Sequence, residues 1–498
     1  MCPPTGDSDP LALSIDVGTS STRVMLWDLQ GRAVENAHAQ VAYRMNTTPE
    51  GGVEMDMEEL ATHVERCLDT ALANAGEKAK RVAVVGVSTF WHSCLGVDAK
   101  GRPVTPLYNW ADMRAAAAAQ RLRERLDAEA IHRRTGCPLH PSYYPARLAW
   151  LRESFPDTFS KVAQWLSPGE FLYRRWFGRT DVPISISMAS ATGLFNQKRC
   201  VWDEELLNQV GLSAKHLAPI AADGERLEGL QSAYASRWPA LANKPFCLPY
   251  GDGACSNVGS GCVDSTHMAI NLGTSGAIRV LWDIRREALD PDPPAGLWRY
   301  RVDGYRPLIG AAFSDGGIVY DWMQRTLRLP ENAENLLAGR EPGAHGLLFL
   351  PFLAGERSFG WSLSARASLM GLQLDTAPLD ILAAGMEAVA MQFAEAVERL
   401  KPLFPKASRI VASGGALGHS PLWAQMMADA IGHPIVLSKE AEASSRGAAL
   451  LALETMGFIA DLGRITADPQ KTYRPHTAHH QVFMQLRQRF KEVLAQSL

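Results

Sequence analysis

Two segments that lie far apart in the chain are near copies of each other. Residues 15–28 read IDVGTSSTRVMLWD and residues 270–283 read INLGTSGAIRVLWD, and seven of the fourteen aligned positions are identical. Each copy has a short apolar run, a Gly-Thr-Ser sequence and a second apolar run, which predicts two strands joined by a tight polar turn. The duplicated hairpin constrains the fold strongly, because it implies two halves of the chain built on the same plan.

The polar turn of each copy is suited to binding a phosphate. Gly18 and Gly273 leave the backbone unhindered, and consecutive backbone N–H groups can form an anion-binding concavity without a lysine. Two such turns imply one ligand held from both sides. The alternative is that both are ordinary hairpin turns, where Gly, Ser and Thr are common for local reasons, but duplication at this distance favours binding. The hydroxyl groups that add donors belong to Thr19, Ser20, Thr274 and Ser275.

The two copies differ in charge at one position, where Asp16 of the first is matched by Asn271 of the second. Only the first hairpin therefore brings a carboxylate. Proteins usually hold Mg²⁺ through one or two carboxylates together with water and substrate phosphates. This makes Asp16 a candidate metal-binding residue, and a metal–nucleotide complex the candidate ligand.

Length and charge narrow the class of protein. A repeated unit of roughly 250 residues in a chain of 498 predicts two domains, 1–245 and 246–498. The net charge of −3 provides no overall basic field, so we expect no nucleic acid or membrane partner, and a small-molecule ligand instead. The first ten residues lack a secretory signal and no apolar run is long enough to span a bilayer, so a cytoplasmic location is expected. The oligomeric state is left open, a homodimer included.

Strand and helix patterns alternate along the chain. This alternation predicts an α/β protein with mixed sheets covered by helices. A less regular stretch at 221–245 is interpreted as a boundary, and another at 284–306 as an elaborated hairpin. The clearest elements are a capped helix that starts near Asp56, a buried strand over 81–88, a helix over 379–400 and a strand over 409–412.

Asp252 lies where the two predicted halves join. It follows a short strand in the sequence Gly251-Asp252-Gly253 and falls at a predicted helix start. The positive end of the helix would keep the carboxylate ionised, and a carboxylate within reach of a substrate hydroxyl can accept its proton during phosphoryl transfer. The alternative is that Asp252 only caps the helix. The residues alone leave both interpretations open.

Several further loops could complete a nucleotide and substrate site. Paired glycines after a strand let a purine or phosphate approach the backbone, whereas aromatic residues beside His, Asp and Arg can stack on a carbon chain and bind hydroxyls. The structural alternatives are that paired glycines form ordinary turns and that a lone His or Trp belongs to the core. The candidate nucleotide residues are Gly316, Gly414, Gly415 and Ala416, and the candidate substrate residues are Trp91, His92, Trp110 and Asp112.

Taken together and in order, these motifs resemble the FGGY family of carbohydrate kinases. The resemblance covers nearly the whole chain. The matching pieces are Asp16-x-Gly18-Thr19-Ser20, Trp110-x-Asp112-x-Arg114, Gly251-Asp252-Gly253, Leu272-Gly273-Thr274-Ser275-Gly276, the run from Leu348 to Arg357, and Gly414-Gly415-Ala416.

The resemblance implies two duplicated actin-like, ribonuclease H-like domains, with a cleft that closes over MgATP and an open-chain sugar, polyol or sugar acid. It implies that Asp252 is the catalytic base and that Asp16 supports Mg²⁺. It further implies that the two Gly-Thr-Ser turns take the phosphates of ATP and that Gly414 and Gly415 lie by the adenosine.

Two subfamilies compete for the substrate. The segments 181–196 and 274–279 resemble gluconokinases, and the chain resembles xylulokinases and other pentulose or polyol kinases more distantly. A gluconate carboxylate needs a cation, for which Arg147, His92 and His140 are the candidates, since arginine can bind a carboxylate through two hydrogen bonds. The family's usual lysine before Glu170 is absent, because Gly169 stands there.

The expected reaction is in-line transfer of the ATP γ-phosphoryl group to a terminal hydroxyl. Two other classes stay open at this point: an actin-like ATPase that acts as a chaperone or filament, and a silent sugar-binding regulator. A dinucleotide oxidoreductase is not expected, because no Gly-x-Gly-x-x-Gly opens a helix after the first strand.

Overall fold

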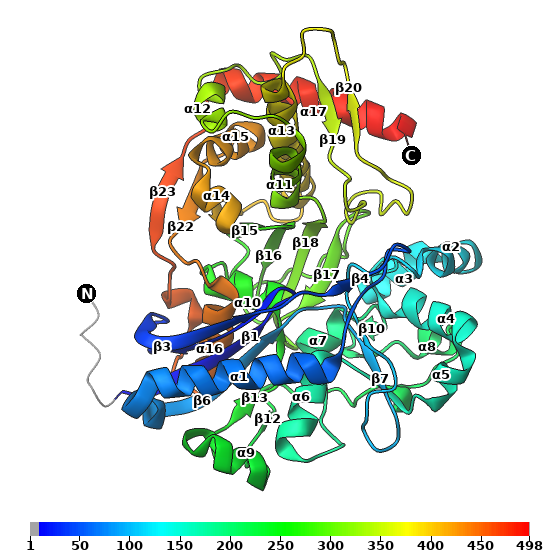
Figure 1. The fold of residues 1–498 in the computed structure, drawn as a ribbon, viewed down its shortest axis with the longest axis vertical. Coiled ribbons are helices and arrows are strands. Elements are labelled where there is room, and N and C mark those ends of the chain that lie inside the picture. Colours follow the sequence, from blue (N-terminus) through cyan, green and yellow to red (C-terminus); the bar gives the residue numbers. More distant parts are fainter. Residues whose placement is uncertain (1–8, 498) are drawn as a thin grey trace.

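The computed structural model describes residues 9–497, so most of the N-terminal segment used in the localisation argument lies outside it. The described chain forms two lobes, each built around one large sheet (Figure 1). Each sheet has seven strands among the described residues. None of the described helices is both long and apolar enough to cross a membrane.

The first sheet carries the first hairpin. Its strands, in the order in which they pair, are β12 (Arg226–Leu227), β13 (Phe246–Cys247), β6 (Val82–Thr89), β1 (Leu11–Val17), β2 (Ser21–Trp27) and β3 (Ala33–Ala42), and β14 (Tyr250–Gly251) also pairs with β6.

The second sheet carries the second hairpin. Its strands, in the order in which they pair, are β17 (Trp298–Arg301), β18 (Pro307–Phe313), β16 (Gly276–Leu281), β15 (His267–Leu272), β21 (Arg409–Ser413), β22 (Ile435–Ser438) and β23 (Pro469–Tyr473).

Pairing within the two sheets confirms the predicted duplication. In the first sheet β1 is antiparallel to β2 and parallel to β6, and in the second β15 is antiparallel to β16 and parallel to β21. The register places Asp16 opposite Ser88 and Asn271 opposite Ser413. Asn271 donates from Nδ2 to the Ser413 hydroxyl at 3.2 Å. The two polar side chains that distinguish the copies therefore occupy equivalent places in the two halves.

The two turns are not identical, although their sequences align without a gap. The first hairpin closes with Val17 opposite Thr22, and the Gly18 N–H donates to the Ser21 carbonyl at 3.0 Å. The second closes with Leu272 opposite Gly276, so its turn is one residue shorter. Glycine at position 276 lets the shorter turn pack against Phe393, because a Cβ there would lie 2.9 Å from that ring.

Long helices cover the sheets and start where the sequence predicts. Helix α1 (Met57–Ala75) begins at an Asp56 cap, whose carboxylate accepts hydrogen bonds from the Glu58 and Glu59 N–H groups at 2.7 and 3.0 Å. Helix α13 (Pro378–Leu400) buries a continuous apolar stripe in the second lobe. The second lobe also contains α11 (Gly317–Thr326), α12 (Ala333–Leu337), α14 (Gly415–His419), α15 (Pro421–Ile431) and α17 (Thr477–Ser497).

One helix from the end of the chain belongs to the first lobe. Helix α16 (Ala443–Thr455) packs on β1 and β6 and crosses α10 (Asp252–Gly259), as Figure 1 shows in the lower lobe. Strands β13 and β14 also lie in the first sheet, although they follow residue 245. The chain therefore does not pass from the first lobe to the second at residue 245, because β13, β14, α10 and α16 all follow that residue and belong to the first lobe. The boundary at that residue stays a prediction for the repeat itself.

A layer of short helices and small sheets extends the first lobe. The helices are α2 (Ala116–Arg125), α3 (Ala128–Thr135), α4 (Tyr144–Ser154), α5 (Pro156–Lys161), α6 (Pro168–Phe177), α7 (Ile186–Ser190), α8 (Glu204–Gln209) and α9 (Ser232–Arg237). The small sheets of both lobes are built from β4 (Asn46–Thr47), β5 (Val53–Met55) and β8 (Leu107–Tyr108), from β7 (Leu95–Val97) and β9 (Gln164–Leu166), from β10 (Phe195–Asn196) and β11 (Val201–Trp202), and from β19 (Leu348–Leu350) and β20 (Ser368–Met370).

Candidate active site

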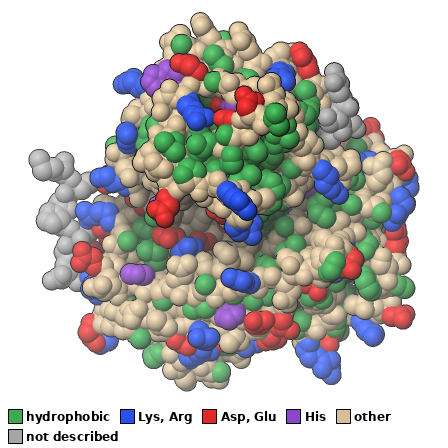
Figure 2. Space-filling model, turned by 45° about the horizontal axis from the view of Figure 1, so that its top comes forward, with side chains coloured by type: hydrophobic (Ala, Val, Ile, Leu, Met, Phe, Trp, Pro, Cys, Tyr) green, Lys and Arg blue, Asp and Glu red, His purple; other side chains and the backbone are tan. Residues whose placement is uncertain are grey.

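A cavity of about 140 Å³ lies where the two lobes meet, and we call it the acceptor cavity. The molecule is visibly hollowed between its lobes (Figure 2). Both hairpin turns reach this cavity, the first through Thr19 and the second through Ser275. The remaining lining residues are Trp91, His92, Trp110, Asp252, Gly276, Ala277, Arg279, Trp298, Tyr300, Ala312 and Arg357.

Asp252 is the one carboxylate among the described residues that line the acceptor cavity. It opens helix α10, and its Oδ1 accepts a hydrogen bond from the Gly253 N–H at 2.7 Å. Burial raises the pKa of Asp252, while the positive charges of Arg279 and Arg357 act in the opposite direction. The carboxylate is thus held at the cavity with a raised proton affinity, which suits a general base.

The glycines on either side of Asp252 make room for an aromatic ring. A Cβ on Gly251 would overlap the indole nitrogen of Trp91, and a Cβ on Gly253 would overlap the same ring. The Trp91 indole N–H donates to the Ser187 carbonyl at 3.1 Å, which fixes the ring in place. The Gly-Asp-Gly sequence is therefore explained by packing as well as by turn geometry.

We expect Gly251→Ala to lower kcat/KM about tenfold or more, because the added methyl group must displace Trp91 or Asp252. Steady-state kinetics would measure the loss. The double variant Gly251→Ala/Trp91→Phe has a smaller ring and should recover part of it. If Gly251→Ala keeps wild-type kinetics, the ring is not what requires glycine here.

The side chain of His92 contributes a neutral acceptor. Its Nδ1 lies 2.6 Å from the Ala191 carbonyl oxygen. Burial lowers the pKa of His92 well below its usual value, and Arg357 adds to this effect. Since a carbonyl can only accept, the single proton of the neutral ring must sit on Nδ1. The Nε2 atom is left as an acceptor for a hydroxyl group. His92 itself has a backbone φ of +64°, an uncommon conformation for a residue other than glycine.

His140 is also neutral. Burial lowers its pKa well below the usual value, with Arg357 acting in the same direction. Its Nδ1 accepts a hydrogen bond from the Ser142 N–H at 3.2 Å, so Nε2 carries the proton. Since neither His92 nor His140 is charged, neither fits the predicted role of a cation that binds a substrate carboxylate.

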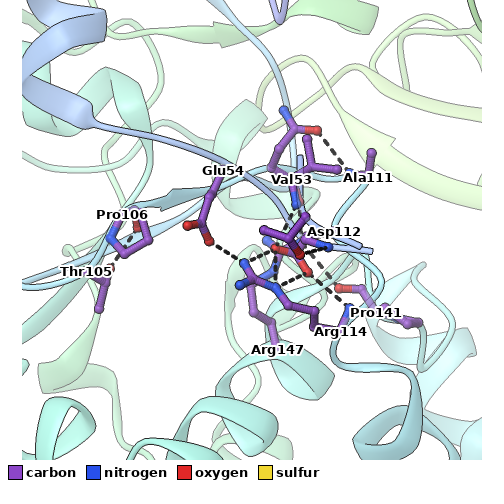
Figure 3. Close-up of polar contacts among 12 residues, drawn as sticks. Val53, Glu54, Thr105, Pro106, Ala111, Asp112, Arg114, Pro141 and Arg147 are labelled. Atoms are coloured by element: carbon purple, nitrogen blue, oxygen red, sulfur yellow. Dashed lines mark hydrogen bonds and ion pairs between the residues drawn. The ribbon is translucent and has the colours of Figure 1, made fainter. Parts of the chain in front are cut away.

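Two further residues predicted to contact the substrate point elsewhere. Arg147 is 1% exposed, and its Nη groups donate to the carbonyl oxygens of His92 and Asn109 at 2.6 and 2.7 Å. Asp112 is bound by the Arg114 guanidinium, which also pairs with Glu54 (Figure 3). Neither Arg147 nor Asp112 lines the acceptor cavity in the described chain. Their contacts hold in place the loops that carry His92 and Trp110. These contacts do not support the predicted role of Arg147 and Asp112 in binding the substrate.

Two arginines that the sequence analysis did not single out face the cavity instead. Arg279 has buried Nε and Nη1 atoms without a hydrogen-bond partner, and Arg357 has a buried Nε without one. The Arg357 guanidinium carbon lies 4.3 Å from the centre of the Trp110 ring. Trp298 and Tyr300, from the stretch interpreted as an elaborated hairpin, stack at 4.1 Å and form one wall.

A second cavity, of about 560 Å³, lies on the other side of the second hairpin, and we call it the nucleotide cavity. Gly273 and Thr274 of the turn line it, whereas Ser275 of the same turn lines the acceptor cavity. One turn thus separates the two cavities. The other lining residues are Gly317, Tyr320, Asp321, Glu334, Gly415, Ala416, His419, Ser420 and Trp423.

The glycines predicted to approach a nucleotide divide into two groups. Gly415 lines the nucleotide cavity, and Gly414 before it has φ +102° and lies against the Leu272 backbone, where no side chain fits. Gly316 does not line it among the described residues, and its N–H donates to the Thr274 carbonyl at 3.2 Å. Gly316 therefore holds the second turn in place, which differs from the predicted nucleotide contact.

Comparison with known proteins decides the family. The N-terminal domain model of the FGGY family of carbohydrate kinases matches residues 11–259, and the C-terminal domain model of that family matches residues 268–456. The chain belongs to the FGGY family of carbohydrate kinases. Its predicted fold class, two actin-like domains with the ribonuclease H-like plan, is confirmed, and the open alternative of an actin-like chaperone or filament is excluded.

Individual relatives of this FGGY kinase differ in substrate. Gluconokinase from Bacillus subtilis is 29% identical over 479 residues, which cover 93% of this chain and 91% of that protein. A xylulose kinase from Lactobacillus acidophilus superposes with a TM-score of 0.88 at 28% identity, covering 97% of both chains. A gluconate kinase from Lactobacillus acidophilus gives 0.87 at 28% identity, again covering 97% of both chains. Overall similarity therefore supports a carbohydrate kinase and does not separate a sugar acid from a ketose.

Asp16 of this FGGY kinase is a buried carboxylate without a strong counter-charge. It is 7% exposed, and its neighbour Arg23 pairs with Glu442 at 3.0 Å. Burial raises the pKa of Asp16 to about 7, and the charge of Asp252 adds to this effect. A divalent cation would supply the missing charge, so the residue fits its predicted role at a metal.

This raised pKa makes stability fall as the pH rises. Between the ordinary pKa of an aspartate and about 7, the folded protein keeps the Asp16 proton whereas the unfolded chain loses it. In the absence of metal and nucleotide, we expect Asp16→Asn to gain stability over the wild type by roughly 2 to 3 kcal/mol more at pH 8 than at pH 5. Denaturant unfolding at both pH values measures this difference. An equal effect of the substitution at both pH values would show that Asp16 titrates normally.

Proposed function

We propose that this FGGY kinase transfers the γ-phosphoryl group of ATP to a terminal hydroxyl of an open-chain sugar acid of the gluconate type. The nucleotide occupies the cavity beside Gly273 and Gly415, and the sugar acid occupies the acceptor cavity beside Asp252. The observation that carries this proposal is the shared turn, since Gly273 and Thr274 line the nucleotide cavity and Ser275 lines the acceptor cavity. A phosphoryl group at that turn would have the rest of the nucleotide on one side and the carboxylate of Asp252 on the other.

The residues of the acceptor cavity divide the work of the reaction. Asp252 accepts the proton of the attacking hydroxyl, and Nε2 of His92 accepts a hydrogen bond from another hydroxyl of the sugar. Trp91 and Tyr300 supply flat faces for the carbon chain. Positioning dominates this kind of transfer, because its transition state is loose and needs little covalent help from the protein.

Asp16 is the residue that would hold Mg²⁺, for which its buried and uncompensated carboxylate is suited. When bound, the ion supplies positive charge that offsets the charge of the phosphates. Thr19 and Ser275 add hydroxyl donors from the two turns. The need for ATP agrees with the predicted cytoplasmic location, and the oligomeric state stays open.

The charge of the acceptor cavity favours a sugar acid over a ketose. Arg279 and Arg357 carry two positive charges, Asp252 carries one negative charge, and His92 is neutral. The cavity is therefore left with an excess of one positive charge that a substrate carboxylate can balance. A ketose such as xylulose is the second candidate, which is supported by the similarity to a xylulose kinase.

An ADP-release assay over gluconate, xylulose, ribulose and glycerol tests this proposal. We expect kcat/KM for gluconate to exceed that for each neutral substrate by tenfold or more, since a charge-assisted pair is worth about 1.5 to 3 kcal/mol. A preference for xylulose would replace the sugar acid by a ketose. ADP release that does not depend on any sugar would refute the kinase reaction itself.

A further inference from the structure

We propose that Arg279 reads the substrate carboxylate in the acceptor cavity. This assignment rests on the proposed function, and it names the residue that selects a sugar acid. Arg357 also lines the cavity and contributes charge. Arg279 is thereby a specificity-determining residue, which takes no part in bond making.

The first support is that two nitrogen atoms of the Arg279 guanidinium have no hydrogen-bond partner among the described residues, although the charge of Asp252 acts on the group. Its Nε and Nη1 atoms are shielded from solvent and bond to no described group. A buried hydrogen-bond donor without an acceptor is costly. We therefore infer that these N–H groups of Arg279 bind an acceptor on a ligand. Arg147, in contrast, spends its Nη donors on backbone carbonyls.

The second support is the direction of strand β16. Gly276, Ala277 and Arg279 of this strand line the acceptor cavity, together with Ser275 of the turn before it. Ser275 belongs to the turn shared with the nucleotide cavity, so this end faces the incoming phosphoryl group. Four residues of strand span about 13 Å, so the Arg279 backbone lies away from the turn, whereas its Nε and Nη2 atoms lie beside Gly253, 2.9 and 3.0 Å from where a Cβ of that residue would be. A substrate with a hydroxyl at Asp252 would therefore have the Arg279 guanidinium within its reach.

The third support is the space that the fold provides for this side chain. Arg279 pairs with Gly310 of β18, which in turn pairs with Trp298 of β17. A Cβ on Gly310 would lie 3.0 Å from Cγ of Arg279 and 2.9 Å from the Trp298 ring. Glycine at this position lets the stem of Arg279 and the indole lie side by side. The guanidinium is thereby directed by packing and needs no polar partner to hold it.

The fourth support is the mutual effect of the two guanidinium groups. Burial lowers the pKa of Arg279, the negative charge of Asp252 acts against this, and the positive charge of Arg357 lowers the pKa further. An anion bound between them removes that repulsion. Arg357 already stacks on Trp110 and sits on a loop that Glu356 holds by accepting hydrogen bonds from the Gly360 and Ser362 N–H groups at 2.8 and 3.0 Å.

Gluconate and gluconamide form a matched pair of probes, since the amide is close to isosteric and carries no charge. The experiment measures KM for gluconate and the inhibition constant of gluconamide for the wild type, Arg279→Met and Arg279→Lys. Arg285→Gln, an exposed arginine on the loop after β16, serves as the control. We expect Arg279→Met to raise KM for gluconate about 10- to 100-fold and to leave gluconamide binding within about threefold. Arg279→Lys should keep part of the preference because it keeps the charge.

The outcomes separate this assignment from the function on which it rests. If the wild type phosphorylates gluconate but Arg279→Met still binds gluconate much better than gluconamide, Arg279 is not the residue that recognises the carboxylate. Equal losses for both probes, or a fall in kcat alone, would place Arg279 at the phosphoryl group and overturn the assignment. If the wild type prefers a ketose over gluconate, the proposed function itself fails. Should Arg279→Met not fold, the ratio for Arg279→Lys decides, and a wild-type ratio in that variant contradicts the proposal.

Discussion

Asp252→Asn will lower kcat by about two to three orders of magnitude and leave ATP affinity within about threefold of the wild type, because it removes a general base but no nucleotide contact. Asparagine keeps the shape of the side chain and can still accept the hydrogen bond from the Gly253 N–H. Steady-state kinetics with saturating gluconate and ATP gives the first quantity, and calorimetric titration with ATP gives the second.

The pH dependence provides a sharper version of this test. Since burial raises the pKa of Asp252, wild-type kcat should fall as the pH drops through that raised value. This acidic limb should be absent from the Asp252→Asn profile. The exposed Asp375→Asn serves as the control for an aspartate substitution. Wild-type turnover in Asp252→Asn would remove Asp252 from its role as the base.

Gly447→Ala will lower the free energy of unfolding by roughly 2 to 4 kcal/mol, an effect in the range of a badly overpacked core. Helices α10 and α16 cross through two glycines. A Cβ on Gly447 would overlap the Cys255 carbonyl group, and a Cβ on Gly259 would overlap the Ala443 carbonyl group. Backbone atoms cannot rotate away as side chains do, so α10 must shift. Because Asp252 opens that helix, kcat should fall as well.

Thermal unfolding and kcat of the purified variant test this expectation. Gly418→Ala is the matched control for stability, since a Cβ there would meet no described atom within 4 Å. We expect the control to unfold at the wild-type temperature or above it. If Gly447→Ala matches the control, the helix crossing tolerates a wider separation and does not fix the position of Asp252.

The repeat made the fold predictable. The Gly-Thr-Ser turns, the Asp56 cap and the stripe of the helix now seen at Pro378–Leu400 are local signals, and each forms where its pattern indicates. The place of helix α16 was not predictable in this way, because its contacts with β1, β6 and α10 join residues far apart in the sequence.

The residues of the acceptor cavity were predicted only in part, because the sequence does not show which hydrogen-bond partners a polar or charged side chain will have. Arg147 resembled a free cation in sequence, but backbone carbonyls occupy its Nη donors. Arg279 was quoted only as part of a subfamily motif, although an arginine alternating with Ser275 and Ala277 in an apolar strand marks one face of that strand. Trp298 and Tyr300 alternate in the same way within a stretch that was interpreted as irregular.

The central claim is that one turn separates nucleotide from sugar, with Asp252 on the sugar side. A crystal structure with Mg²⁺, a non-hydrolysable ATP analogue and gluconate tests it most directly. We expect the adenosine beside Gly415, the γ-phosphate at the turn of residues 273–275, and a terminal hydroxyl of gluconate within hydrogen-bond distance of Asp252. A triphosphate bound away from residues 273–275, or gluconate bound outside the acceptor cavity, would contradict the account.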